Sequence, residues 1–93
     1  MIKSFADKET AAVFAGEQVK RLVPQIQQSA RRKLKLLDAA TSLDSLRIPP
    51  GNRLEALKKD RKGQHSIRIN SQWRVCFRWA QDNAEDVQIV DYH

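Results

Sequence analysis

The residues best suited to chemistry are two arginines in alternating stretches and a polar triplet at positions 91–93. Arg68 and Arg74 offer planar guanidinium groups, which bind phosphate and stabilise developing negative charge. Asp91, Tyr92 and His93 directly follow an apolar stretch. The imidazole of His93 has an ordinary pKa of about 6.5, which suits proton transfer near neutrality. This set indicates acid–base chemistry on a phosphodiester, although a plain polar tail is the simpler interpretation of the triplet.

No motif of another catalytic class is visible. Cys76 is the only cysteine, and neither His65 nor His93 combines with it in a recognised metal-ligand spacing. The chain has no glycine-rich phosphate loop and no Gly-x-Ser-x-Gly motif. We therefore expect no metal site and no cofactor, and we interpret Cys76 as a small strand residue. A lone cysteine without an internal partner is typical of a reducing cytoplasm.

Residues 65–79 contain two runs in which apolar and polar side chains alternate, as in half-buried strands. Both apolar sets face one core if Ile69 pairs with Trp73 across a loop of residues 70–72. Arg68 then lies opposite Arg74, where like charges destabilise the sheet by up to about 1 kcal/mol. An anion bound between the arginines would relieve this repulsion; so would arginines that splay into solvent, or a bulge that shifts the register. Since Arg74 would project from the polar face, we expect its truncation to cost little stability.

The net charge of +6 is unevenly distributed. Residues 31–62 hold ten basic and four acidic side chains, or +6, whereas residues 1–30 carry +1 and residues 63–93 carry −1. So basic a middle third predicts a polyanionic partner such as nucleic acid, the ribosome or an acidic protein, although solvated helix faces explain many basic runs. We expect RNA binding to be mainly electrostatic and centred on residues 53–74. The basic residues expected to bind RNA there are Arg53, Lys58, Lys59, Arg61 and Arg68.

Two helices are expected in the first half of the chain. Asp7 suits the N-cap of a short helix that Gly16 ends. Pro24 suits the first turn of a longer helix over about residues 24–41, whose apolar side chains recur at helical spacing.

The second half predicts strands. A break at residues 48–52 separates the helices from candidate strands at 53–57, within 65–79 and at 87–91, and residues 2–5 suit one more short strand. This order predicts one α+β domain, residues 1–93, with two or three helices packed on one face of an antiparallel-dominated sheet. No apolar run reaches membrane-spanning length, so we expect a cytoplasmic protein that binds no membrane.

Four stretches together resemble a known family: residues 49–57 (Pro-Pro-Gly-Asn-Arg-Leu-Glu-Ala-Leu), 60–67 (Asp-Arg-Lys-Gly-Gln-His-Ser-Ile), 70–77 (Asn-Ser-Gln-Trp-Arg-Val-Cys-Phe) and 91–93 (Asp-Tyr-His). They resemble HigB-type toxins of the RelE-like superfamily of bacterial toxin–antitoxin systems, close to the plasmid maintenance killer group. The resemblance implies a compact RelE-like fold and metal-independent, ribosome-dependent cleavage of messenger RNA. In that reaction the ribose 2′-hydroxyl attacks the adjacent phosphate.

The resemblance also implies roles for individual residues. Arg74 would hold the scissile phosphate with support from Arg68 and Lys58, and residues 91–93 would orient the nucleotide and move protons. Some HigB toxins carry histidine where this chain has Glu55. Glu55 would then either serve as the base or weaken phosphate binding through its charge.

A cognate antitoxin is the partner that the resemblance implies, usually a helix-turn-helix protein that neutralises the toxin and represses their operon. The toxin would therefore reach operator DNA only through the antitoxin. A rival interpretation is the ParE-like branch of the superfamily, which inhibits DNA gyrase without cutting RNA. Trp73, Arg74 and the triplet at 91–93 favour the nuclease.

Overall fold

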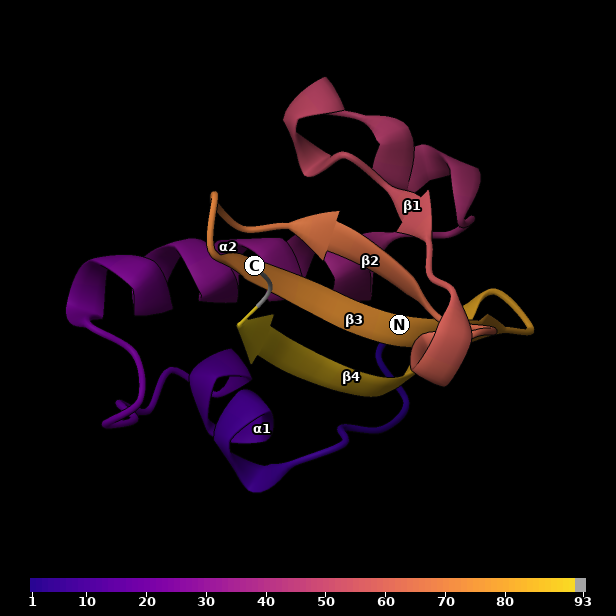
Figure 1. Cartoon of the computed structure of the whole chain (residues 1–93). Helices are drawn as coiled ribbons and strands as arrows, with labels where there is room; N and C mark the ends of the chain where they lie inside the picture. Colours follow the sequence, from indigo (N-terminus) through magenta and orange to yellow (C-terminus); the bar gives the residue numbers. More distant parts are fainter. Residues whose placement is uncertain (92–93) are drawn as a thin grey trace.

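The computed structural model describes residues 1–91, and the sheet and helices follow the predicted order (Figure 1). The helices are α1 (Lys8–Phe14) and α2 (Pro24–Ala39), followed by the short 3-10 turns η1 (Asp44–Arg47), η2 (Pro50–Asn52) and η3 (Lys59–Arg61). The strands are β1 (Glu55–Ala56), β2 (His65–Arg68), β3 (Trp73–Ala80) and β4 (Asn83–Asp91).

The four strands form one antiparallel sheet in the order β1-β2-β3-β4. In the β2–β3 hairpin, Ile67 pairs with Val75 and Arg68 with Arg74, which confirms the register predicted from the alternation. Asn70 shapes the connecting loop, because its side-chain oxygen accepts hydrogen bonds from the backbone amides of residues 72 and 73, each at 2.8 Å. The bulge lies elsewhere, between β3 and β4 at Cys76/Arg78.

Both helix starts were predicted correctly. Asp7 caps α1, where its carboxylate accepts a hydrogen bond from the Thr10 amide at 2.6 Å, and Pro24 begins α2. The predicted end of α2 was two residues too late, since Ala40 already has extended backbone angles. Residues 2 and 5 form only isolated parallel bridges to β4 rather than a strand.

The predicted strand at 53–57 is shorter than expected, and only Glu55 and Ala56 belong to it. Arg53 precedes it with a left-handed φ of 45°, and Lys59 with φ of 57° lies in the turn that follows. Each residue turns the chain away from extended geometry, so the strand cannot continue past either of them. The side chain that this segment buries is Leu57.

The two faces of the sheet differ. Helices α1 and α2 cover one face, as predicted, and in Figure 1 α2 passes behind β2 and β3. The core lies between them and includes Val13, Ala30, Leu34, Leu37, Ile67, Val75, Phe77, Val87 and Ile89. The other side, here called the open face, carries side chains that alternate with these: Glu55, Ser66, Arg68, Arg74, Cys76 and Gln88. Among residues 1–91, no helix is long and apolar enough to cross a membrane.

Candidate functional site on the open face

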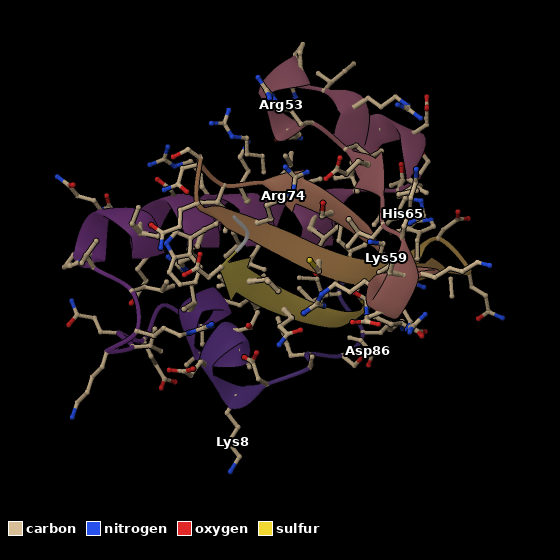
Figure 2. All side chains as sticks on the ribbon, viewed as in Figure 1. Lys8, Arg53, Lys59, His65, Arg74 and Asp86 are labelled. Atoms are coloured by element: carbon tan, nitrogen blue, oxygen red, sulfur yellow. The ribbon has the colours of Figure 1, made fainter. Side chains whose placement is uncertain are left out.

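Arg74 is the most constrained charged residue of the open face. Its Nε donates to the hydroxyl of Ser66 at 2.8 Å, and its Nη2 donates to the backbone carbonyl of Arg53 at 2.7 Å. The carboxylate of Glu55 lies 3.6 Å from Nη2. Figure 2 shows Arg74 on β3 beside the chain segment that carries Arg53. These contacts hold the planar guanidinium in one orientation.

Arg74 lies on the polar face as predicted but is buried there, which argues against the expectation that its truncation costs little stability. Only 9% of its surface is exposed, because residues 53–55 fold over the strand and cover it. Truncation would leave the buried Ser66 hydroxyl and the Arg53 carbonyl without this donor. Lost partners of this kind cost about 1–3 kcal/mol each, so the alanine variant combines a chemical and a structural effect.

Hydrogen bonds of the neighbouring residue Asn52 hold the backbone at Arg53 in place. Asn52 is fully buried, and its side-chain amide donates to the carbonyls of Leu46 at 3.1 Å and Ile48 at 3.2 Å. Its side-chain oxygen accepts a hydrogen bond from Lys33 of α2. Asn52 thus fixes the turn that places the Arg53 carbonyl over Arg74, while the Arg53 side chain itself is exposed.

Arg68 lies directly opposite Arg74 and is partly buried. Part of the expected repulsion is offset by Glu55, whose half-exposed carboxylate provides a negative charge beside Arg74. The protein's own carboxylate thus lies beside one of the two arginines, Arg74. Glu55 is close enough to Arg74 either to act in proton transfer there or to compete with a bound phosphate.

Arg61 is the second arginine held on the open face. Its Nη1 donates to the side-chain oxygens of Gln64 at 3.1 Å and Gln88 at 3.3 Å. Cys76 is buried on the same face: burial raises the pKa of its thiol, and the positive charges of Arg61 and Arg74 oppose that rise. The charges of both guanidinium groups therefore act on Cys76.

The lysines of the segment 58–59 lie at the rim rather than among these groups. Lys58 and Lys59 are both exposed, and with residues 55–57 they line a shallow pocket beside β1. They add positive charge around the site without a fixed contact to Arg74. Their geometry suits long-range attraction of a polyanion.

The predicted terminal triplet is only partly placed. Asp91 pairs with Trp73, one position beyond the Val90–Arg74 pair, so its side chain starts on the other side of the sheet from Arg74. The side chain of Gln72 donates to the Asp91 carboxylate at 3.1 Å. Tyr92 and His93 lie outside the described residues. The structure therefore brings together Arg74, Glu55, Arg68 and Arg61, with the Arg53 backbone, and leaves Asp91 at the end of the sheet.

Two contributors were missed from the sequence. Ser66 and Gln88 are ordinary polar residues that hold Arg74 and Arg61, and both belong to the row that crosses the sheet at Cys76. The predicted β2–β3 register already placed Ser66 on the same face as Arg74, so the contact between them could have been predicted from the sequence. The contact between Arg61 and Gln88 could not have been predicted in this way, because 27 positions separate the two residues in the sequence.

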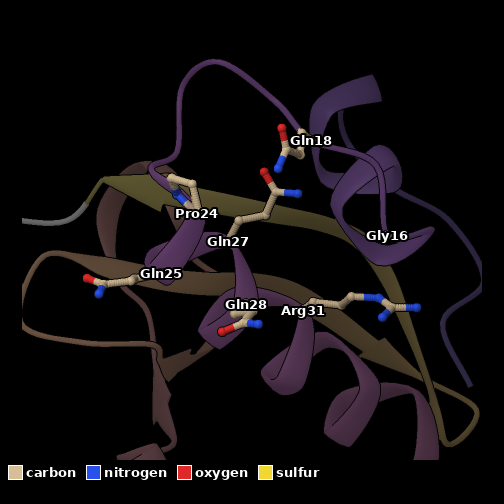
Figure 3. Close-up of a pocket in the computed structure, with 7 residues that line it drawn as sticks. All are labelled: Gly16, Gln18, Pro24, Gln25, Gln27, Gln28 and Arg31. Carbon is tan, nitrogen blue, oxygen red and sulfur yellow. The ribbon is translucent and has the colours of Figure 1, made fainter.

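A second pocket lies far from these residues, between the end of α1 and the start of α2 (Figure 3). Its polar side chains already hold the connecting segment. Gln27 accepts from the Val19 amide at 2.9 Å and donates to the Glu17 carbonyl at 2.6 Å, and Arg31 donates to the Phe14 carbonyl at 3.3 Å. These hydrogen bonds attach the segment between α1 and α2 to α2, so the polar side chains of this pocket have a structural role. Within residues 1–91, no group of three or more His, Cys, Asp or Glu side chains is arranged to hold a metal ion.

The chain resembles known proteins over nearly its whole length. Residues 3–93 match the family described as HigB-like toxin, a RelE-like toxin of the type II toxin–antitoxin system HigB. Toxin HigB-1 of Vibrio cholerae serotype O1 is 44% identical over 80 residues, covering 85% of this chain and 84% of that protein. Endoribonuclease HigB of Proteus vulgaris is 30% identical over 93 residues and covers all of both chains.

Solved structures show the same fold. The YoeB–YefM complex from Staphylococcus aureus aligns with a TM-score of 0.62 at 16% identity, covering 100% of this chain and 98% of that one. A mutant of YafQ from E. coli aligns with a TM-score of 0.66 at 12% identity, covering 98% and 93%. The predicted RelE-like α+β fold is thereby confirmed.

Proposed function

The chain belongs to the HigB-like family of RelE-like toxins of type II toxin–antitoxin systems, and on this basis we propose how it acts as an endoribonuclease. We propose that it cleaves messenger RNA on the ribosome and so inhibits translation; the relative named Endoribonuclease HigB supports the endoribonuclease activity. The observation that carries this proposal is the guanidinium of Arg74, held rigidly on the open face by Ser66 and the Arg53 carbonyl.

In the proposed reaction the ribose 2′-hydroxyl attacks the adjacent phosphorus, and the bond to the 5′-oxygen of the next nucleotide breaks. The phosphoryl oxygens gain negative charge as the attack proceeds. Donors already aimed at that charge stabilise the transition state without reorganising, which is worth about 10²–10³-fold in rate for one donor. Arg74 fills this role.

Protons must leave the 2′-hydroxyl and reach the departing 5′-oxygen. We assign the acid to His93, since histidine has an ordinary pKa suited to proton transfer near neutrality, and we assign the orientation of the nucleotide to Asp91 and Tyr92. Glu55 is the carboxylate beside Arg74 and is the candidate for activating the 2′-hydroxyl. No step in this scheme requires a metal ion or an organic cofactor.

The RNA backbone would cross the open face with its scissile phosphate at Arg74. Arg61 and Arg68 contact phosphates on either side of the scissile one, while Arg53, Lys58 and Lys59 attract the strand from the rim. The same basic surface suits ribosomal RNA, which would present the messenger.

We further propose a cytoplasmic partnership with a cognate helix-turn-helix antitoxin, through which alone the toxin would reach operator DNA. The comparison with a toxin–antitoxin complex supports a partner of this kind. In this scheme the whole chain, residues 1–93, works as one domain.

A translating extract tests the proposal. Addition of the purified chain should produce truncated messenger, mapped by primer extension, whereas Arg74→Lys should not. Naked RNA without ribosomes is the control for ribosome dependence and should remain intact. Growth inhibition with intact messenger and inhibited DNA supercoiling would instead identify a gyrase inhibitor and contradict the proposal.

A further inference from the structure

We infer that Ser66 is a positioning residue that aims the Arg74 guanidinium at the scissile phosphate, an inference that rests on the function proposed above. Ser66 would not touch RNA. It would act through Arg74, by fixing the plane in which the guanidinium donates.

The geometry of the contact supports this role. Ser66 binds Nε of Arg74 at 2.8 Å, and the Arg53 carbonyl binds Nη2 at 2.7 Å. Contacts to two different nitrogens fix both the tilt and the rotation of a planar group, which a single contact leaves variable. The two anchors come from β2 and from the segment after η2, so neither moves with the Arg74 backbone alone.

The neutral hydroxyl of Ser66 is also chemically suited to positioning Arg74. Ser66 is fully buried, and its hydroxyl is a neutral acceptor, so it orients Arg74 without cancelling its charge. A carboxylate at this position would neutralise the guanidinium that must bind phosphate. The carboxylate that is present, Glu55, lies farther away at 3.6 Å and is half exposed, where water and an incoming phosphate compete with it.

Cys76 provides a matched control for burial. It pairs with Ser66 across β2 and β3, is equally buried and points to the same face. Truncation at either position removes one buried heavy atom from the same row of the sheet. Of these two neighbours, Ser66 is the one whose hydroxyl accepts a hydrogen bond from the Nε of Arg74.

Single-turnover cleavage on purified ribosome–messenger complexes tests the inference with the full-length chain. Ser66→Ala should lower the maximal rate by about 10–100-fold, the range expected for a small misplacement of a catalytic group, with little change in half-saturating concentration. Cys76→Ala should keep the maximal rate despite a similar loss in thermal stability. Ser66→Thr retains a hydroxyl and should restore most of the activity.

A double-variant cycle separates positioning from general structural support. Lysine has no Nε–H in the guanidinium position, so Ser66→Ala should have no further effect in an Arg74→Lys background. Independent, multiplicative effects would overturn the inference. So would an unchanged rate in Ser66→Ala while Arg74→Lys is inactive, a result that leaves the proposed function standing. An Arg74→Lys variant of full activity would instead overturn the proposed function itself.

Discussion

Two basic regions of this molecule contain the same kinds of side chain but differ in how those side chains are held. On the open face, Arg74 and Arg61 each donate hydrogen bonds to side chains from other elements of the fold. On α2, Arg32 and Lys35 are exposed. Lys35 packs its ammonium group 4.6 Å from the ring centre of Phe14.

Positive charge alone therefore does not define the site. An exposed arginine must lose rotamer freedom before it can bind, whereas a held guanidinium has already lost it during folding. Fixed donors also favour a transition state over a ground state, because they are aimed at one position. The open face therefore suits catalysis, and the outer face of α2 suits long-range attraction.

The largest expected effect tests this contrast directly. Arg74→Lys keeps the charge but loses the fork that Ser66 and the Arg53 carbonyl hold, so messenger cleavage should fall by about 10²–10³-fold. Arg32→Lys on α2 should leave cleavage unchanged. Cleavage rates on ribosomes and thermal unfolding curves would be measured for both variants. Equal losses in the two would remove the distinction between the regions.

Next in size is the loss of the second held arginine. Arg61→Ala should weaken binding to ribosome-bound RNA by on the order of tenfold, since hydrogen bonds to charged groups are worth about 1.5–3 kcal/mol. The matched change Arg32→Ala removes the same charge from α2 and should have a much smaller effect. Equilibrium binding at several salt concentrations gives both values. Equal weakening would mean that net charge alone determines affinity.

Glu55→Gln sharpens the comparison within the open face. Removing the carboxylate beside Arg74 should tighten RNA binding by up to about fivefold, because half-exposed ion pairs are worth roughly 0–1 kcal/mol. The cleavage rate of the same variant assigns the role of Glu55: a general base costs about 10²–10⁴-fold when removed, and a competitor costs nothing. Weaker RNA binding by Glu55→Gln would contradict the expected competition with phosphate.

The smallest expected effect lies at the rim. Lys59 is exposed with φ of 57°, a conformation that glycine adopts without strain. Lys59→Gly should preserve or slightly raise the melting temperature while it flattens the salt dependence of RNA binding by roughly 0.7 in logarithmic slope. Lys58→Ala should change the slope equally without the gain in stability. A lower melting temperature for Lys59→Gly would show that the lysine stem packs against the site.

Local patterns determined much of this protein. Period-two alternation over residues 65–79 predicted the hairpin register, including Arg68 opposite Arg74, because strand periodicity and loop length leave little choice of pairing. Asp7 and Pro24 predicted helix starts, since capping depends on residues a few positions apart. The family resemblance also followed from short motifs in the sequence.

Tertiary structure alone decided how the site is held. Arg74 donates a hydrogen bond to the carbonyl of Arg53, 21 positions away in the sequence. Arg53 has a left-handed backbone conformation and follows the buried Asn52, and this turn places its carbonyl beside Arg74. Arg61 meets Gln88 only because β4 lies beside β3. Such contacts carry no periodic signal, since they depend on where a loop returns to the sheet rather than on neighbouring residues. The register of the hairpin therefore follows from the sequence, but the orientation of the Arg74 guanidinium follows from the packed fold.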